Sequence, residues 1–384
     1  MTEPASKAGR PPPKNPFGVR SVKAMLWQAL AVAGFAAIVL WAGHNAAGNM
    51  TRRSITFGFD FLLHPAGFDI PFHLLSWDAS DSYGWALIVT FGNSLLAAGL
   101  SIGLASALGL LLALMRLSGN PLAAGISRAV MEIVRNTPQL VQIIFLYFVV
   151  LQSLPPPRQS LVLGSGFFLN VRGLLVPEAT LDPLMWLGGA LLLGLTIIGW
   201  FGHRPGRLSG LLLPPALLLA WLAVAGATAH WRIPEFKGFN YVGGLRLPPE
   251  LLALWLGISI YTSAFISEII RASILGIAHG QTEAALSVGL TRWQAMFLVI
   301  LPQALRTLIP PLTSQYLNVI KSTTLGAAIA YPDVLQIFGR TVLNQSGRAM
   351  EVMALLLGLF LAINLLTAAA MNRWNRKLAL QGLT

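Results

Sequence analysis

Cysteine is absent from the 384 residues of this chain, and charged residues make up only 10% of it. The lack of cysteine excludes disulfides, thiol catalysis and thiolate metal sites. Soluble domains usually carry about 25% charged residues. The low charge, with 55% hydrophobic residues and a mean hydropathy of +0.67, excludes a soluble enzyme and a disordered scaffold. The composition therefore predicts an all-α polytopic membrane protein.

The few charges are strongly unbalanced. The chain has 26 Lys and Arg residues against 14 Asp and Glu residues, which gives a net charge of +12. In a soluble protein this excess would suggest nucleic acid. Here the basic residues lie mostly at the ends of apolar runs and in short loops, so orientation in the membrane explains them and we expect no nucleic-acid partner.

Apolar runs long enough to cross a bilayer recur along the chain. About 20 residues of helix span about 30 Å of hydrocarbon. The runs that we interpret as membrane spans are 24–43, 83–115, 137–154, 183–201, 208–228, 251–267, 307–330 and 352–371. The sequence thus predicts about eight transmembrane helices.

The seventh of these runs is the most polar, because Pro310, Pro311 and Lys321 interrupt it. We keep it as a span because it returns the basic C-terminal residues to the side of the basic N-terminal tail. Most Lys and Arg residues then fall on that side, and the positive-inside rule predicts that both termini are cytoplasmic.

Motifs for chemistry are absent as well. No segment matches the phosphate-binding pattern G-x-x-x-x-G-K-[ST], and the six histidines never take a metal-ligand spacing such as H-x-x-x-H. No nucleophile–base arrangement is visible. We therefore expect no catalytic residue, no metal and no cofactor in this chain.

The most informative segment is residues 261–301, which read YTSAFISEIIRASILGIAHGQTEAALSVGLTRWQAMFLVIL. A membrane helix passes through Glu268 and Arg271, which can pair at i, i+3 spacing, and glycines then break it. A short helix follows, and Gly289 suits its C-terminal end. The residues from Thr291 to Gln294 fit a capping box that opens another helix. We expect two short helices that meet at an angle and insert into a groove on another protein; an ordinary connecting loop is the alternative.

This segment closely resembles the cytoplasmic E-A-A loop of permease subunits of bacterial ABC importers. Glu283, Ala284, Ala285 and Gly289 carry the match. The extended pattern E-I-x-R…G-Q-x-E-A-A-x-x-x-G, followed by L-P-Q-A-L-R, resembles the polar amino acid branch of that family. The string M-E-I-V-R-N-T-P at 131–138 also resembles that branch.

The resemblance implies a function and a set of partners. The chain would be the permease subunit of a type I ABC importer that moves L-amino acids into the cytoplasm by alternating access. A separate ATPase dimer, which binds ATP and Mg, would dock on the E-A-A helix. A periplasmic amino acid-binding protein would deliver the substrate. The second permease subunit would be a related chain or a second copy, and the location would be the bacterial inner membrane.

The resemblance also divides the chain. Residues 83–154 and 251–380 match the permease core, whereas shorter relatives lack the rest. A cytoplasmic tail (1–23), an extra helix with an outer loop (24–82) and an inserted region with two helices (155–250) are additions. A chain enlarged in this way resembles the first membrane subunit of the general L-amino acid importers of proteobacteria. The inserted region contains no functional motif.

Lys321 is the first candidate for substrate binding. An ammonium inside a membrane segment is costly and marks a pathway or an ion partner. Pro310 and Pro311 can interrupt the helix, and broken helices near the midplane bind anionic groups in transporters. We expect Lys321, Ser322, Thr323, Thr324 and Leu325 to line the pocket. The alternative for Lys321 is that it snorkels to the interface.

Asn93 and Ser94 on the second span are weaker candidates, since small polar residues in membrane helices more often pack than bind. Two other functions remain as alternatives to the ABC permease. A carrier driven by ion gradients would need intramembrane carboxylates and an inverted repeat, and only Glu268 lies well inside a span. An intramembrane enzyme would need a catalytic constellation that the sequence lacks.

Overall fold

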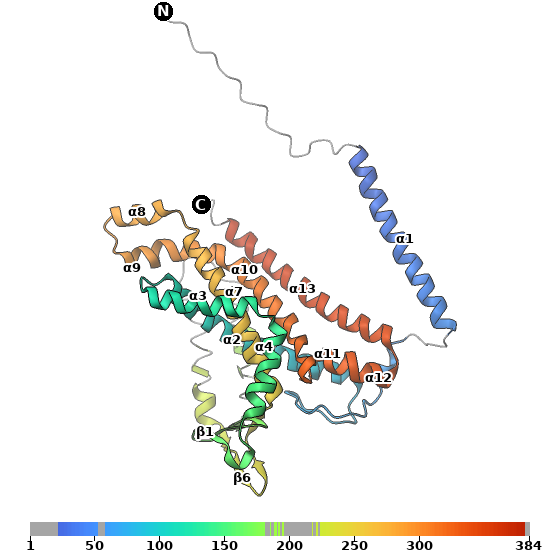
Figure 1. Ribbon diagram of the computed structural model, residues 1–384. Helices are drawn as coiled ribbons and strands as arrows, with labels where there is room; N and C mark the ends of the chain where they lie inside the picture. The colour runs from blue at the N-terminus through green and yellow to red at the C-terminus, as the bar shows by residue number, and fades with distance from the viewer. Residues whose placement is uncertain are drawn as a thin grey trace, which may run out of the picture. The chain divides into compact units, whose positions relative to one another are not determined.

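The computed structural model describes residues 22–52, 58–180 and 223–380, together with scattered positions between 185 and 221. The chain divides into two compact units, Met1–Gly58 and Phe59–Thr384. Most of the described residues are helical, as Figure 1 shows. The predicted fold class, a membrane protein built from helices, is confirmed.

Helix α1, Val22–Arg52, is the described part of the first unit. Its segment Met25–Asn45 is long and apolar enough to cross a membrane. The Trp27 and Trp41 side chains on it are 72% and 69% exposed. A helix of this length that is apolar all round suits lipid, and this supports the first predicted span.

The second unit contains four more helical segments that can cross a membrane. These are Tyr83–Leu117, Pro249–Leu275, Arg292–Ile329 and Ala349–Ala369. A further pair, Pro121–Asn136 and Gln139–Ser153, passes the same test together and is bent by 99°. Five spans, or six with the bent pair, are therefore found among the described residues.

These segments correspond to six of the predicted spans. The seventh run, the most polar of the eight, is confirmed as a helix long and apolar enough to cross a membrane. It is longer than predicted, since the helical segment begins at Arg292 instead of 307. The predicted spans 183–201 and 208–228 lie in large part outside the described residues.

Helix α2, Tyr83–Leu117, and helix α7, Pro249–Leu275, form the centre of the second unit. The Ser82 side chain caps α2 by accepting a hydrogen bond from the Trp85 backbone N–H. Small residues on α2 allow close approach: a Cβ atom on Gly109 would lie 2.7 Å from Ile266 Cγ2 of α7. Without a hydrophobic driving force between helices in lipid, such close packing stabilises the pair.

Helix α3, Pro121–Asn136, and helix α4, Gln139–Phe145, form the bent pair. Asn120 caps α3 by accepting bonds from the backbone N–H groups of Leu122 and Ala123. Thr137 precedes Pro138, and the residue before a proline avoids the helical conformation, so the helix ends there and the chain turns. A π-helical turn, Leu146–Val150, and a 3₁₀ turn, Leu151–Ser153, then extend α4.

The C-terminal half of the core follows α7 without long loops. Its helices are α8 (His279–Ser287), α9 (Arg292–Ala295), α10 (Leu301–Ser322), α11 (Val334–Gln336), α12 (Leu343–Ser346) and α13 (Ala349–Leu380). The π-helical turns Met296–Ile300 and Ile337–Val342 and a 3₁₀ helix, Thr323–Ile329, connect them. The short 3₁₀ helix Asp60–Leu63 packs at the start of α2.

The predicted outer loops contain short antiparallel strands, which the all-α expectation missed. One sheet has the order β1 (Leu161–Gly164), β2 (Phe167–Asn170), β3 (Gly173–Val176) and β8 (Leu245–Leu247). Two further pairs join β4 (Glu178–Thr180) to β5 (His230–Arg232) and β6 (Glu235–Lys237) to β7 (Asn240–Val242). The β3–β8 and β4–β5 pairs join the two ends of the inserted region. Their register depends on partners more than 45 residues apart, which local sequence does not encode.

Candidate functional site

The helix that carries the E-A-A motif is held in place by its C-terminal turn. Gly289 has φ = +88°, a left-handed conformation that glycine adopts without steric cost. Its N–H donates to the Leu286 carbonyl, and the Leu290 N–H donates to the Ala285 carbonyl. This pair of bonds is a Schellman motif. The predicted role of Gly289 as the C-terminal glycine of α8 is confirmed in its geometry.

The capping box predicted at Thr291 is also present. The Gln294 N–H donates to Thr291 Oγ1 at 3.3 Å, and the Thr291 N–H donates to Gln294 Oε1 at 2.9 Å. The helix that it opens is not short, however, because α9 continues through the π-helical turn into α10. The expected pair of short helices is therefore one short helix, α8, followed by the end of a long membrane helix. A capping box marks only where a helix begins. The length of the helix depends on the apolar residues that follow.

Helix α8 presents one face outward. The Glu283 and Ala284 side chains are exposed, whereas Ala285 is 5% exposed and faces the π-helical turn at 296–300 that α8 packs against. Glu283 Oε1 lies 3.0 Å from His279 Nδ1 one turn earlier. An exposed, capped helix with one small residue on its inner face is a rigid surface that a partner can contact.

The predicted break in the seventh span lies at a different place. Pro310 and Pro311 are inside α10, and the helix continues through them to Ser322. Hydroxyl groups bond carbonyls in this stretch: Thr313 Oγ1 donates to the Ile309 carbonyl at 3.0 Å. This bond goes to a carbonyl one turn back within the continuous helix. The α-helix instead ends immediately after Lys321, where the 3₁₀ helix begins, and Ala330 with φ = +59° ends that 3₁₀ helix.

The five residues predicted to line a substrate pocket point in different directions. Lys321 is exposed, and no described residue makes a hydrogen bond or ion pair with its ammonium. The Thr323 and Thr324 hydroxyls donate to carbonyls one turn back, at 2.8 and 2.7 Å. Leu325 packs against the apolar core. Ser322 alone lines a cavity, and its hydroxyl donates to Gln139 Oε1 at 3.3 Å.

That cavity has a volume of about 220 Å³ and lies between the start of α4, α7 and α10. Its polar lining residues are Gln139, Tyr261, Thr262, Gln315, Asn318 and Ser322. The Nε2 atom of Gln139 is buried without a hydrogen-bond partner among the described residues. A buried donor left unsatisfied costs about 1 to 3 kcal/mol, so a small polar ligand that accepts this bond would be stabilised here.

Asn93 and Ser94 have a different arrangement. Asn93 is fully buried, and its Nδ2 donates to the carbonyls of Phe72 and Pro332 at 2.8 and 3.0 Å. Its Oδ1 accepts from the Leu74 N–H, and the Ser94 hydroxyl accepts from Val334 N–H. Neither residue lines the 220 Å³ cavity. The two side chains tie α2 to the segments 72–74 and 332–334, which is a structural role.

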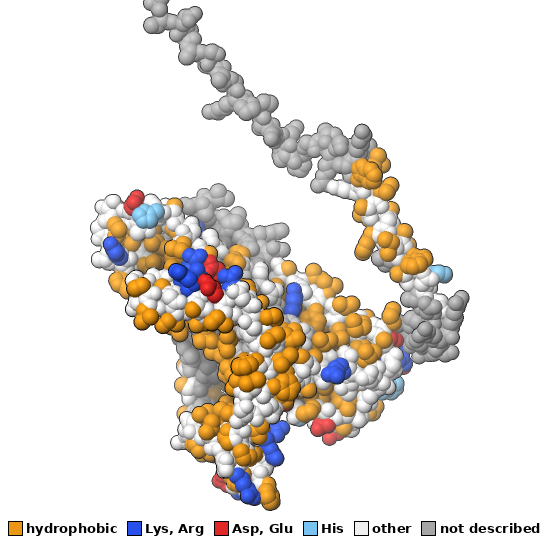
Figure 2. All heavy atoms as spheres, in the orientation of Figure 1, with side chains coloured by type: hydrophobic (Ala, Val, Ile, Leu, Met, Phe, Trp, Pro, Cys, Tyr) orange, Lys and Arg blue, Asp and Glu red, His pale blue; other side chains and the backbone are white. Residues whose placement is uncertain are grey.

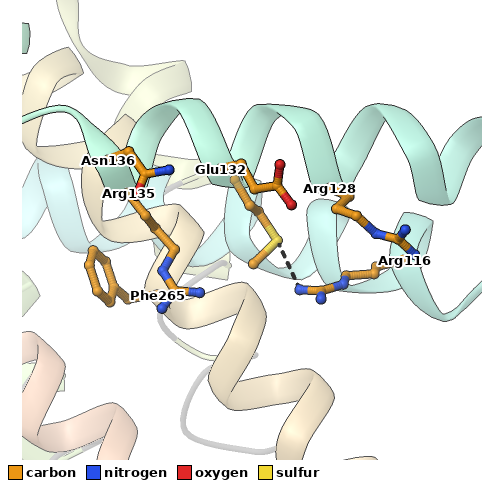
Figure 3. A pocket seen from close by; sticks show the side chains of 7 residues that line it. Arg116, Arg128, Glu132, Arg135, Asn136 and Phe265 are labelled. Carbon is orange, nitrogen blue, oxygen red and sulfur yellow. Dashed lines mark hydrogen bonds between the residues drawn. The ribbon is translucent and has the colours of Figure 1, made fainter.

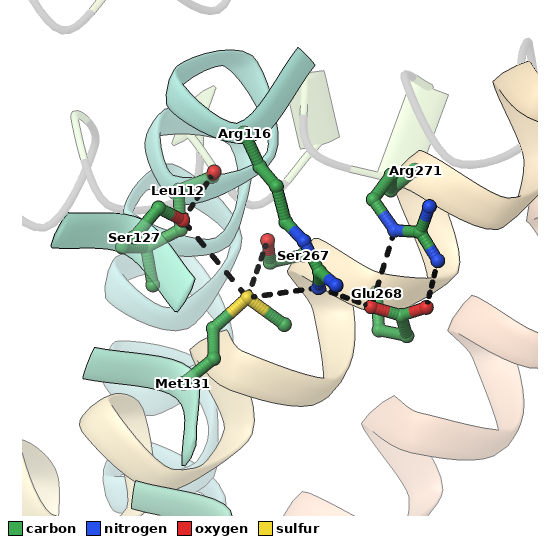
Figure 4. Close-up of polar contacts among 7 residues, drawn as sticks. All are labelled: Leu112, Arg116, Ser127, Met131, Ser267, Glu268 and Arg271. Atoms are coloured by element: carbon green, nitrogen blue, oxygen red, sulfur yellow. Dashed lines mark hydrogen bonds and ion pairs between the residues drawn. The ribbon is translucent and has the colours of Figure 1, made fainter. Parts of the chain in front are cut away.

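Sequence reasoning found the Glu268–Arg271 pair but missed its third member. Arg116 at the end of α2 reaches Glu268 Oε2 at 2.6 Å, and Arg271 holds Glu268 Oε1 at 2.6 Å (Figure 4). Arg116 also lies 3.6 Å from the sulfur of Met131, so α2, α3 and α7 meet at this point. No local pattern links residues 116 and 268, and only the packing of α2 on α7 brings them together.

Two buried carboxyl groups were missed for the same reason. Asp333 and Glu351 are fully buried, and Oδ2 of Asp333 lacks a hydrogen-bond partner among the described residues. Asp333 caps α11, where its Oδ1 accepts from the Gln336 N–H at 2.7 Å. Burial raises the pKa of Asp333 to about 7, although backbone hydrogen bonds oppose that shift. Glu351 lies 3.7 Å from Arg348, which also reaches Asp60.

The fold defines a helical membrane protein that exposes a short capped helix, α8, at one end of its core. Comparison with known proteins identifies the family. Residues 105–380 match the family described as the binding-protein-dependent transport system inner membrane component, and the chain belongs to this family.

Relatives match the chain over nearly its whole length. YhdX of Escherichia coli, whose name assigns it provisionally to the amino-acid ABC transporter permeases, is 44% identical over 95% of this chain and 96% of its own. The general L-amino acid transport system permease protein AapQ of Rhizobium johnstonii is 37% identical over 93% and 92%. The glutamate/glutamine/aspartate/asparagine transport system permease protein BztB of Rhodobacter capsulatus is 31% identical over 90% and 91%. These alignments therefore extend beyond residues 105–380, the part that matches the family.

Proposed function

We propose that this chain is the membrane-spanning permease subunit of an ATP-driven importer of L-amino acids with broad specificity, including acidic and polar ones. The observation that carries the proposal is similarity over at least 90% of the chain to permeases whose names specify general L-amino acid or glutamate, glutamine, aspartate and asparagine transport. Membership of a binding-protein-dependent family argues against a carrier driven by an ion gradient. Glu268, the acidic residue inside a predicted span, supports this choice, because two guanidinium groups hold its carboxylate.

Helix α8 is the element through which ATP hydrolysis would act. We assign it as the contact for a separate ATPase dimer that binds ATP and Mg, with Glu283 and Ala284 on the contacting face. Gly289 would keep the helix at a fixed angle to α9 through its turn. A rigid α8 is needed, because a flexible loop would absorb the movement of the ATPase instead of passing it to α7 and α10.

The cavity lined by Gln139, Asn318 and Ser322 is the proposed place of the substrate within the membrane. It has several hydrogen-bonding groups and a volume of about 220 Å³, which is below the usual range for drug-sized ligands and suits a small polar molecule. Lys321, which precedes Ser322 in the chain, would supply a positive charge for the α-carboxylate that all amino acids share. The remaining candidates Thr323, Thr324 and Leu325 would shape this region through the 3₁₀ helix that they form.

The other partners and the orientation complete the proposal. A periplasmic binding protein would deliver the amino acid, a related chain or a second copy would form the other half of the translocation path, and both termini would lie in the cytoplasm.

The test is uptake of a panel of labelled amino acids by proteoliposomes that contain the complete complex. Uptake of several L-amino acids that needs both internal ATP and the binding protein is the expected result. Uptake driven by a sodium or proton gradient without ATP would contradict the proposal.

A further inference from the structure

A second cavity lies at the end of the core that carries α8. It has a volume of about 410 Å³ and is lined by residues of α2, α3 and α7 (Figure 3). Its charged lining residues are Arg116, Arg128, Glu132 and Arg135, with Asn136 and Phe265 beside them. The guanidinium of Arg135 lies 5.5 Å from the centre of the Phe265 ring, within the range of a cation–π contact.

The charges around this cavity do not balance. Arg116 and Arg271 share the single carboxylate of Glu268. Arg128 and Arg135 form no ion pair with any described residue, and Glu132 is the only carboxylate in the lining. Three guanidinium groups thus line the cavity with one carboxylate. Guanidinium forks bind carboxylate and phosphate oxygens in a bidentate manner, so the cavity suits an anion.

The orientation of α3 is an independent observation that points to the membrane surface. The bent pair turns by 99°, so if α4 crosses the bilayer, α3 lies along its surface. One side of α3 is apolar and exposed, with Leu122 at 71%, Ile126 at 49% and Ile133 at 68%. In Figure 2 a compact group of basic and acidic side chains lies over α3, beside a band of hydrophobic ones. An amphipathic helix with basic residues above an apolar side is typical of the lipid interface.

We propose that the Arg116–Arg128–Arg135 cavity binds the phosphate of an anionic phospholipid headgroup. The phosphate would accept hydrogen bonds from Arg128 and Arg135, while the apolar side of α3 contacts the acyl chains of the same leaflet. Basic pockets at this depth between membrane helices bind such headgroups. This inference does not rest on the substrate or on the ATPase, because it uses only the cavity, the charges and the angle of α3.

The experiment uses the full-length chain in a neutral detergent, with phosphatidylglycerol and phosphatidylcholine of matched acyl chains as probes. Native mass spectrometry measures the affinity for each lipid. We expect phosphatidylglycerol to bind at least about tenfold more tightly, and the double variant Arg128→Gln/Arg135→Gln to lose about tenfold or more of that affinity. The matched control is Arg340→Gln, which removes an exposed arginine from the segment that packs against the opposite end of α2. It should retain the preference.

Two further arms separate the possible anions. Inorganic phosphate at millimolar concentration should not displace phosphatidylglycerol, because it has no acyl chains. The double variant Leu122→Ser/Ile133→Ser should lower the affinity for phosphatidylglycerol, although it leaves the arginines in place. Equal affinity for the two lipids, equal losses in the Arg128→Gln/Arg135→Gln and Arg340→Gln variants, or full displacement by inorganic phosphate would each overturn the proposal.

Discussion

Arg116 and Glu268 lie 152 positions apart in the chain, yet Arg116 Nη1 is 2.6 Å from Glu268 Oε2. The contact joins the last turn of α2 to the part of α7 that leads into α8. Their side chains are 23% and 31% exposed, so water screens the pair only in part. Because Glu268 also holds Arg271, two guanidinium groups share one carboxylate at the base of the E-A-A loop.

Removing the shared carboxylate should destabilise the core. Glu268→Gln leaves Arg116 and Arg271 facing each other without a counter-charge. Fully buried pairs lose about 3 to 5 kcal/mol when one partner is removed, and exposed pairs about 0 to 1 kcal/mol. For this partly buried triad we expect a loss of about 1 to 2 kcal/mol, measured as a lower thermal midpoint in detergent. Glu235→Gln, which breaks a pair about two-thirds exposed, is the control and should change little.

Reversing the charge on α8 should uncouple the transporter. Glu283→Lys should abolish ATP-dependent uptake, because the exposed side chain is proposed to contact the ATPase, while the chain stays folded and inserted. Gly289→Asp should have the same effect, because its φ of +88° strains any other residue. Glu235→Lys is the matched charge reversal at a distant exposed position and should transport normally. The docking role is wrong if Glu283→Lys still copurifies with a full complement of ATPase and transports at the wild-type rate.

The membrane lysine should matter for all substrates. If substrate binding desolvates the pair of Lys321 with the α-carboxylate, truncating the lysine costs about 2 to 5 kcal/mol, and each 1.4 kcal/mol is about tenfold. Lys321→Met should therefore reduce apparent affinity or turnover by about one to three orders of magnitude, and Lys321→Arg should restore part of it. Direct binding or substrate-stimulated ATPase without the binding protein measures this step. Wild-type affinity in Lys321→Met would mean that the lysine only snorkels.

The cavity beside Lys321 can be tested separately. Gln139→Leu removes the buried amide nitrogen that has no partner among the described residues, and Asn318→Leu removes another polar group from the lining. Both should weaken substrate binding by about tenfold, since each hydrogen bond to a charged group is worth about 1.5 to 3 kcal/mol. Gln345→Leu, an exposed glutamine outside this lining, is the control. Normal binding in both cavity variants would place the substrate elsewhere.

The topology can be mapped because the chain has no cysteine of its own. A cysteine at Ser287 should be protected from an impermeant reagent added outside, whereas one at Leu63, which is 84% exposed, should react. Leu63 is a better outer position than Gly67, whose φ of +68° strains other residues. A cysteine at Gln381, outside the described residues, should also be protected. Labelling of Ser287 from outside would reverse the proposed orientation.

Asp333 should make stability depend on pH. Its pKa is raised by burial to about 7 from an ordinary value of 3.8, so between these values the folded state holds a proton that the unfolded state has lost. Stability contributed by this group is therefore complete at low pH and falls as pH rises from about 4 to about 7. Asp333→Asn keeps an oxygen for the Gln336 cap and should raise the thermal midpoint relative to wild type at pH 8 but not at pH 4. Asp78→Asn, at an exposed carboxyl, should not change this slope.

The candidate site divides into parts that local sequence predicts and parts that it does not. Gly289 and the Thr291–Gln294 box act within six residues of chain, so the capping rules place them correctly. Pro310 and Pro311 mislead because the helix continues through both of them and ends at Ser322 instead. Asn93 was the weaker binding candidate, and its bonds to Phe72 and Pro332, which lie 21 and 239 positions away, could not be read from local sequence.

The sequence by itself determined the class of the protein, the membrane spans that the structure describes and the helix α8. These follow from hydropathy over about 20 residues and from capping over a few, so no knowledge of distant neighbours is required. Only the tertiary structure decided the partner of Glu268, the burial of Asp333 and the two cavities. Each depends on which helix faces pack together, and that choice is made by close approaches such as Gly109 against Ile266, between residues that no local pattern connects.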